Sequence, residues 1–173
     1  MLEEKKVKII VRSIDALPNS MKHNDRLIIT ESNLLDMTHV QLKDQVQDCH
    51  TVACCLGHNL NIKGMFGRPH RLVINAVQRL CCAIEATAPT MFNKPIKFIL
   101  MNTTGNQNTH ASEEISISQA FIVGLIRFLL PPHADNEDAA SYLQSRFGSH
   151  QKLIEWWAMR PDSLINEGAV TEY

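Results

Sequence analysis

Small, polar or cationic residues follow four short apolar runs of the sequence. They are Arg12 and Ser13, then Ser32 and Asn33, then Gly57 and His58, and last Asn102, Thr103, Thr104 and Gly105. A guanidinium group such as that of Arg12 can bind a phosphate through two parallel hydrogen bonds. These residues therefore predict a local anion-binding site, provided that the fold brings the ends of the four runs to one place.

The elements between these residues predict how they are positioned. Short apolar runs, several of them rich in β-branched residues, indicate strands at 7–11, 27–30, 51–56, 96–101 and 154–159. Helices are expected at 38–46, 69–86, 112–130 and about 135–146, with Asp36 or Thr38 capping the first and Pro131 and Pro132 ending the third. Strands that alternate with helices indicate an α/β fold with a mostly parallel sheet covered on both faces. Ligands of such sheets bind at the carboxyl ends of the strands, where Arg12 is expected.

The composition limits the possible classes of protein. With 173 residues, 45% of them hydrophobic and 20% charged, the chain is expected to form a single domain over residues 1–173. A net charge of -1 provides no basic field, so neither nucleic acid nor a membrane surface is an expected partner. The five cysteines are odd in number and lack a CxxC spacing, which favours reduced thiols in the cytoplasm and no metal site.

Five stretches of the sequence resemble successive parts of one protein family. VKIIVRSIDALP, ESNLLDM, TVACCLGHN, FILMNTTG and EWWAMRPDSLINEGAVTEY are similar to segments of an atypical short-chain dehydrogenase/reductase domain, in the NAD(P)-binding group that includes NmrA-like proteins. The resemblance extends from Val7 to Tyr173, and the last stretch is its most specific part. It implies a Rossmann-like three-layer sandwich and an oxidoreductase that acts on a small organic substrate.

The resemblance also implies which residues bind a cofactor. Arg12, with Ser13 beside it, corresponds to a contact with the adenosine 2′-phosphate, which favours NADP over NAD. The remaining correspondences place the adenine at Asn33 and Leu34, the central part of the cofactor at Leu56, Gly57 and His58, and the nicotinamide or substrate at Thr103 and Thr104. An alternative for Arg12 is a surface ion pair with Glu31.

One departure from the family concerns the phosphate-binding turn. The glycine-rich turn and the strand before it have no counterpart here, since Gly64 and Gly67 follow no strand. That strand is central in the order 3-2-1-4-5-6, so the expected fold is an N-terminally truncated Rossmann-like domain. Its sheet would be split into two halves separated by about 9–10 Å unless they close, with unpaired inner edges.

A second departure concerns catalysis. Active family members carry Tyr-x-x-x-Lys, in which the lysine lowers the tyrosine pKa, but Pro132 and Asn136 occupy the equivalent positions. Tyr142 and Arg146 have the same spacing further along the helix, where a surface contact is the simpler interpretation. The remaining catalytic candidates are Thr104, His133 and Asn136. The alternative interpretation is structural: Asp135 caps the helix and His133 faces solvent.

Three functions are consistent with these observations. The first is an NADP-dependent oxidoreductase whose partners are a dinucleotide and a small-molecule substrate. The second is a non-catalytic dinucleotide sensor or partner-binding module, which the missing Tyr-x-x-x-Lys favours. The third is a truncated fragment without tight cofactor binding, which the missing glycine-rich turn favours.

Overall fold

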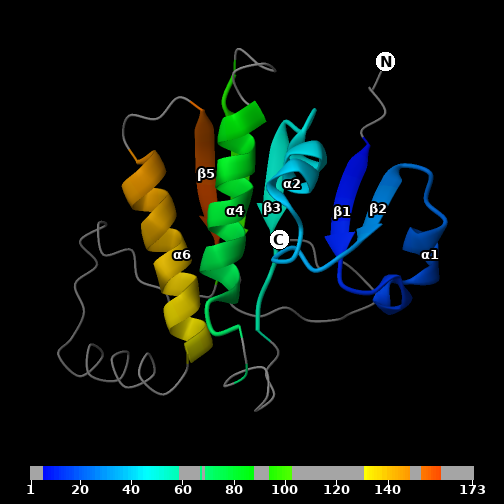
Figure 1. Ribbon diagram of the computed structural model, residues 1–173, viewed down its shortest axis with the longest axis horizontal. Coiled ribbons are helices and arrows are strands. Elements are labelled where there is room, and N and C mark those ends of the chain that lie inside the picture. The colour runs from blue at the N-terminus through cyan, green and yellow to red at the C-terminus, as the bar shows by residue number, and fades with distance from the viewer. Residues whose placement is uncertain are drawn as a thin grey trace, which may run out of the picture.

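The computed structural model describes residues 6–58, 67, 69–87, 94–102, 131–148 and 153–160. This part of the chain has an α/β fold, shown in Figure 1. Its strands are β1 (Val7–Val11), β2 (Leu27–Glu31), β3 (Thr51–Cys54), β4 (Ile96–Met101) and β5 (Ile154–Met159). Its helices are η1 (Ile14–Ala16), α1 (Asn19–Lys22), α2 (His39–Val46), α4 (Leu72–Thr87) and α6 (Pro131–Phe147). The helix expected at 112–130 lies outside the described residues.

The strands form two parallel sheets, β1–β2 and β3–β4–β5. Figure 1 shows that the strands of both sheets run in the same direction, with their carboxyl ends at the lower edge of the view. The predicted parallel pairing is therefore confirmed. The split between β1 and β3 agrees with the expectation of two half-sheets, because among the described residues no backbone hydrogen bond joins these two strands.

The helices α2 and α6 start where the local sequence permits. Thr38 caps α2 through a reciprocal pair in which its hydroxyl accepts from the amide of Gln41 and the Gln41 side chain accepts from the amide of Thr38. α6 begins at Pro131, about four residues earlier than expected, because proline fits the first turn of a helix where its missing N–H has no intrahelical partner.

The helices α2, α4 and α6 lie on one face of the strands (Figure 1). Burial alternates accordingly along β4, where Ile96, Phe98 and Leu100 are buried and Lys97 is exposed. On the opposite face, Trp157 and Met159 of β5 are 44% and 53% exposed. The described residues thus form a sheet layer and one helical layer.

Side chains of β1 and α2 link the small β1–β2 sheet to the rest of the fold. Lys8 of β1 donates to the carbonyls of Asp44 and Gln47 at the end of α2, at 2.9 and 2.8 Å. Gln45 of α2 donates to the hydroxyl of Thr30 in β2 at 3.0 Å, and Ile10 packs against the buried core. These contacts tie β1 and β2 to the segment that leads directly into β3.

Candidate functional site

The ends of β1 and β2 lie next to each other. The amide of Ser32 donates to the carbonyl of Val11 at 2.8 Å, so Arg12 and Ser32 follow paired strands at the same edge. Arg12 is exposed, and among the described residues its side chain forms no hydrogen bond or ion pair. The alternative pairing with Glu31 is absent, since the carboxylate of Glu31 accepts from the amide of Ile14 instead. An exposed guanidinium that no other described side chain engages can bind an anion.

The loop after β2 is folded by the side chain of Asn33. Its amide nitrogen donates to a carboxylate oxygen of Asp36 at 2.8 Å, and its side-chain oxygen accepts from the amide of Leu35 at 3.4 Å. Asn33 is exposed, whereas Leu34 is only 9% exposed and belongs to the core. Of the two expected adenine contacts, Asn33 is therefore accessible at the surface, and the side chain of Leu34 is occupied by the core.

The segment after β3 is open at Gly57. Leu56 packs against the core, while Gly57 is exposed and has an ordinary negative φ. A methyl group added at Gly57 would meet no atom within 4 Å. The protein itself therefore has space for a side chain here, so an effect of Gly57→Ala on ligand binding would report a contact with the ligand.

His58 points into the protein and not toward the edge of the sheet. Its Nε2 is 2.8 Å from Oδ2 of Asp135, and the two side chains are 5% and 1% exposed. The carboxylate of Asp135 also accepts from the amides of Val73 and Ile74 at 2.7 and 3.0 Å. An ionised carboxylate can only accept, so this hydrogen bond requires the His58 tautomer with a proton on Nε2.

This arrangement revises the expected role of Asp135. Asp135 does cap a helix, but the helix is α4 and not α6, in whose first turns Asp135 lies. A carboxylate is favourable there because the first amides of α4 lack intrahelical acceptors and carry the positive end of the helix dipole. Together with His58, Asp135 joins the end of β3 to the starts of α4 and α6.

The other catalytic candidates are only partly described. Asn136 is 8% exposed beside Asp135, so it lies in the interior at the same end of the sheet. Thr103, Thr104 and the side chain of His133 lie outside the described residues. Asn102, which directly precedes the threonines, is 4% exposed, and its amide donates to the carbonyl of Met159 at 2.8 Å.

Tyr142 and Arg146 lack the electrostatic relationship of a proton relay. Burial, followed by the neighbouring Cys81, raises the pKa of Tyr142 to about 12, and the nearby Arg146 lowers it by less. Arg146 pairs with Glu85 at 3.2 Å, and the ring of Tyr142 packs edge-on against Phe147. A catalytic tyrosine needs a lowered pKa, so the raised pKa of Tyr142 argues against a catalytic pair, and each of the two residues contacts a different partner.

A shallow pocket of about 290 Å³ lies between α4 and the loop after β2. It is lined by Leu35, Asn75, Gln78 and Arg79. The guanidinium of Arg79 donates to the carbonyl of Met37 (from Nη2), while its Nε is buried and has no hydrogen-bond partner among the residues that the structure describes. Arg79 was not among the predicted site residues. It lies beside the apolar stripe of a predicted core helix, and the sequence carries no signal that it contacts a loop 42 residues earlier.

Within the described part of the chain, no group of three His, Cys, Asp or Glu side chains could hold a metal ion. All five cysteines are free thiols. Among the helices described, none has the length and apolar character required to cross a bilayer. No protein-family profile matches the sequence, and a search of curated proteins finds no significant match.

Proposed function

We propose that this protein binds NADP in the manner of an atypical short-chain dehydrogenase/reductase, at the carboxyl edge of a Rossmann-like three-layer fold. The observation that carries the proposal is Arg12, which is exposed where β1 ends and forms no side-chain hydrogen bond or ion pair with another described residue. The described sheet and its layer of helices α2, α4 and α6 supply two of the three layers. The edge is the usual ligand site of parallel α/β sheets.

The chemistry at this edge favours a phosphorylated ribose. Arg12 can form two hydrogen bonds with a 2′-phosphate, and the hydroxyl of Ser13 can add a third. The carboxylate of Glu31, the last residue of β2, accepts from the amide of Ile14. NADP is therefore the expected cofactor, with NAD bound more weakly.

The rest of the dinucleotide is expected to lie along the same edge of the sheet. In this proposal the adenine lies near Asn33 and in the pocket beside Leu35, where the amides of Asn75 and Gln78 can bond to the edge of a base. The central part of the cofactor passes Gly57, where the protein leaves open space. The nicotinamide would then approach Thr103, Thr104 and Asn136.

The proposal is tested by thermal unfolding with NADPH, NADP and NADH. At a concentration 100 times its Kd, a ligand stabilises the folded state by about 2.7 kcal/mol. Arg12→Ala is expected to weaken NADPH binding by at least about tenfold, because it removes a charged bidentate contact. Arg26→Ala is the matched control, since Arg26 is equally exposed but precedes β2 at the opposite end of the sheet. Gly57→Ala is expected to weaken binding without lowering the stability of the free protein.

Two outcomes would contradict the proposal. If none of the nucleotides raises the unfolding temperature, the chain does not bind a dinucleotide tightly and the proposal is wrong. If Arg12→Ala and Arg26→Ala weaken NADPH binding equally, Arg12 is not the phosphate contact.

A non-catalytic dinucleotide-binding module is the second candidate function. It is favoured by the raised pKa of Tyr142 and by the ion pair that occupies Arg146. Hydride transfer from NADPH to a panel of carbonyl and quinone substrates distinguishes the two functions. Turnover that is lost in Asn136→Ala would favour the oxidoreductase, and binding without turnover would favour the module.

A further inference from the structure

The segment 12–13, which directly follows β1, is held between two hydrogen bonds to the end of β2. Before the segment, the carbonyl of Val11 accepts from the amide of Ser32 at 2.8 Å. After the segment, the amide of Ile14 donates to Oε1 of Glu31 at 3.1 Å. Both partners are consecutive residues at the carboxyl end of β2. The backbone that carries the proposed phosphate contacts is therefore fixed against β2 at both of its ends.

The hydroxyl of Ser13 is not used by the helix that it precedes. Ser13 is the N-cap residue of η1, and a serine in this position usually accepts from an amide of the first helical turn. Here its side chain makes no such bond, and it has no hydrogen-bond partner within the described ranges. The amide of Ile14, the first residue of η1, is bonded to Glu31 instead. The Ser13 hydroxyl is thus available to donate to a ligand.

The same bond determines what Glu31 does to the charge of Arg12. Glu31 pairs in register with Val11, the residue directly before Arg12. Glu31 and Arg12 nevertheless form no ion pair, because the carboxylate accepts from the amide of Ile14. A carboxylate bonded to Arg12 would occupy the donors that a phosphate requires. The contact with the backbone therefore both orders the segment and leaves the guanidinium available.

We propose that Glu31 is a positioning residue that sets the preference of the site for a phosphorylated ribose. This role rests on the proposed NADP site. By accepting from Ile14, Glu31 fixes the direction in which residues 12 and 13 leave β1, so that both side chains can reach one phosphate. Without this bond, the segment must be ordered when the ligand binds, which lowers affinity. NADH lacks the 2′-phosphate, so its binding does not depend on this segment.

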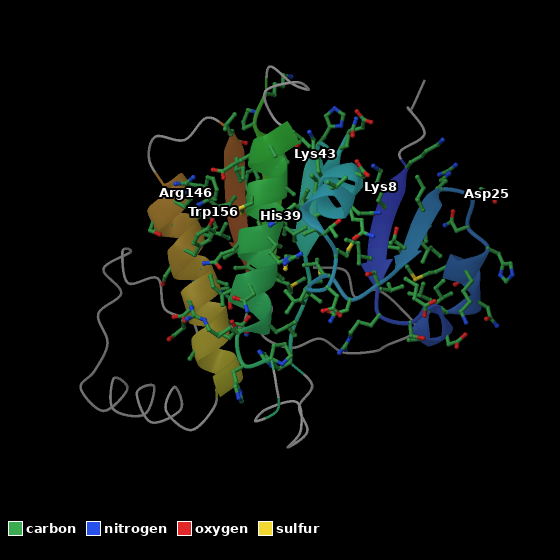
Figure 2. The ribbon with its side chains drawn as sticks, in the orientation of Figure 1. Lys8, Asp25, His39, Lys43, Arg146 and Trp156 are labelled. Atoms are coloured by element: carbon green, nitrogen blue, oxygen red, sulfur yellow. The ribbon has the colours of Figure 1, made fainter. Side chains whose placement is uncertain are left out.

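The strand β1 has other anchors, so a substitution of Glu31 should leave it in place. Figure 2 shows Lys8 between β1 and α2, and its ammonium group donates to the carbonyls of Asp44 and Gln47 at 2.9 and 2.8 Å. Ile10 packs against the buried core. The effect of a substitution at Glu31 is therefore expected to be confined to the turn after β1.

The test measures the Kd of NADPH and of NADH for each variant. Glu31→Ala should weaken NADPH binding at least about threefold and leave NADH binding unchanged, because one hydrogen bond that orders the phosphate contacts is lost. Glu31→Gln keeps an oxygen that can accept from Ile14 and removes the charge, so it should bind NADPH as tightly as the wild type or more tightly. Asp25→Ala is the matched control, since Asp25 is an exposed carboxylate before the opposite end of β2 (Figure 2), and it should change neither affinity.

Two further measurements separate positioning from a general loss of structure. In an Arg12→Ala background, Glu31→Ala should lose most of its effect on NADPH binding, because Glu31 acts through the segment that carries Arg12. In the free protein, the amide of Ile14 should exchange with solvent at least about threefold faster in Glu31→Ala than in the wild type. Glu31→Gln should keep the slower exchange.

Four results would overturn the proposal. If the wild type prefers NADPH and Glu31→Ala keeps the full preference, Glu31 does not position the segment, and the NADP site stands without it. If Glu31→Ala weakens both nucleotides equally, its role is a general structural one. If Glu31→Ala binds NADPH more tightly, the charge of Glu31 repels the phosphate and this effect outweighs positioning. If the wild type binds neither nucleotide, or both equally, the NADP site is itself wrong and the role of Glu31 fails with it.

Discussion

The buried carboxylate of Asp135, which pairs with His58, connects several segments of the protein. Asp135 accepts hydrogen bonds from His58 and from two amides of α4, and its side chain is 1% exposed. The two paired residues are 77 positions apart in the sequence. The carboxylate therefore fixes three segments at the edge where the proposed nicotinamide site lies.

We expect Asp135→Ala to lower the free energy of unfolding by about 2–4 kcal/mol, because it leaves buried donors without an acceptor. Asp138→Ala is the matched control on the same helix. Its carboxylate forms an exposed ion pair with Arg71 at 3.2 Å, so the expected loss is at most about 1 kcal/mol. Urea unfolding measures both, and equal losses would show that Asp135 is not an anchor.

The raised pKa of Tyr142 has a consequence for stability at alkaline pH. A phenol with a pKa near 12 in the folded protein and near 10 in the unfolded chain stabilises the fold below about pH 10, and this stabilisation is lost as the pH rises toward 12. Urea midpoints should therefore fall less steeply between about pH 9 and 11 in Tyr142→Phe than in the wild type. An unchanged slope, or a spectrophotometric pKa below 10, would contradict the structural interpretation of Tyr142.

At the residue scale, the sequence predicted which residues lie at the carboxyl ends of the strands, but not which side chains contact one another there. Arg12 and Asn33 are exposed at strand ends as expected, because a residue after a parallel strand must lie at the sheet's edge. The inward direction of His58 and the position of Arg79 depend on partners that are distant in sequence. A single sequence carries no signal for such pairs.

The strands were the most predictable elements. β1, β4 and β5 have the predicted bounds, because each is a short apolar run between polar residues. β3 ends at Cys54 and not at Leu56, since the apolar run continues beyond the last residue that pairs with β4. Apolar character predicts burial, whereas the end of a strand depends on its neighbour.

Helix starts were less predictable than strands. Asp36 and Thr38 were both predicted as possible caps of α2, and the structure shows Thr38 in this role, paired with the nearby Gln41. The cap of α4 could not, because it is supplied by Asp135 from another helix. Prolines 131 and 132 were read as the end of one helix, and they begin another.

The described strands are divided between two sheets. β1 and β2 form a two-stranded sheet, and among the described residues Lys8, Ile10 and the bond between Gln45 and Thr30 link it to the rest. Two-stranded sheets have little stability of their own. The β3–β4–β5 sheet, by contrast, carries the fully buried Phe98, Leu100 and Ile154.

We therefore expect β1 and β2 to open independently of the rest of the fold. In native-state hydrogen exchange at low urea, the amide of Ile9 should exchange through a local opening of lower free energy than the amide of Phe98. Lys8→Met, which removes the bonds to α2 but keeps an apolar stem, should speed exchange in β1 and β2 only. If the amides of Ile9 and Phe98 exchange with the same opening free energy, the two sheets open together and this prediction is wrong.

The helices on one side of the sheet also give the protein two distinct indole environments. Trp156 packs against the core, while its neighbour Trp157 is 44% exposed, with the ammonium of Lys97 5.8 Å from its ring centroid. These are the two tryptophans of the chain, so its fluorescence comes from one chromophore on each face of β5. A quencher dissolved in water reaches the outer indole first, and a molecule that covers the open face shields it while leaving the emission of the inner indole unchanged.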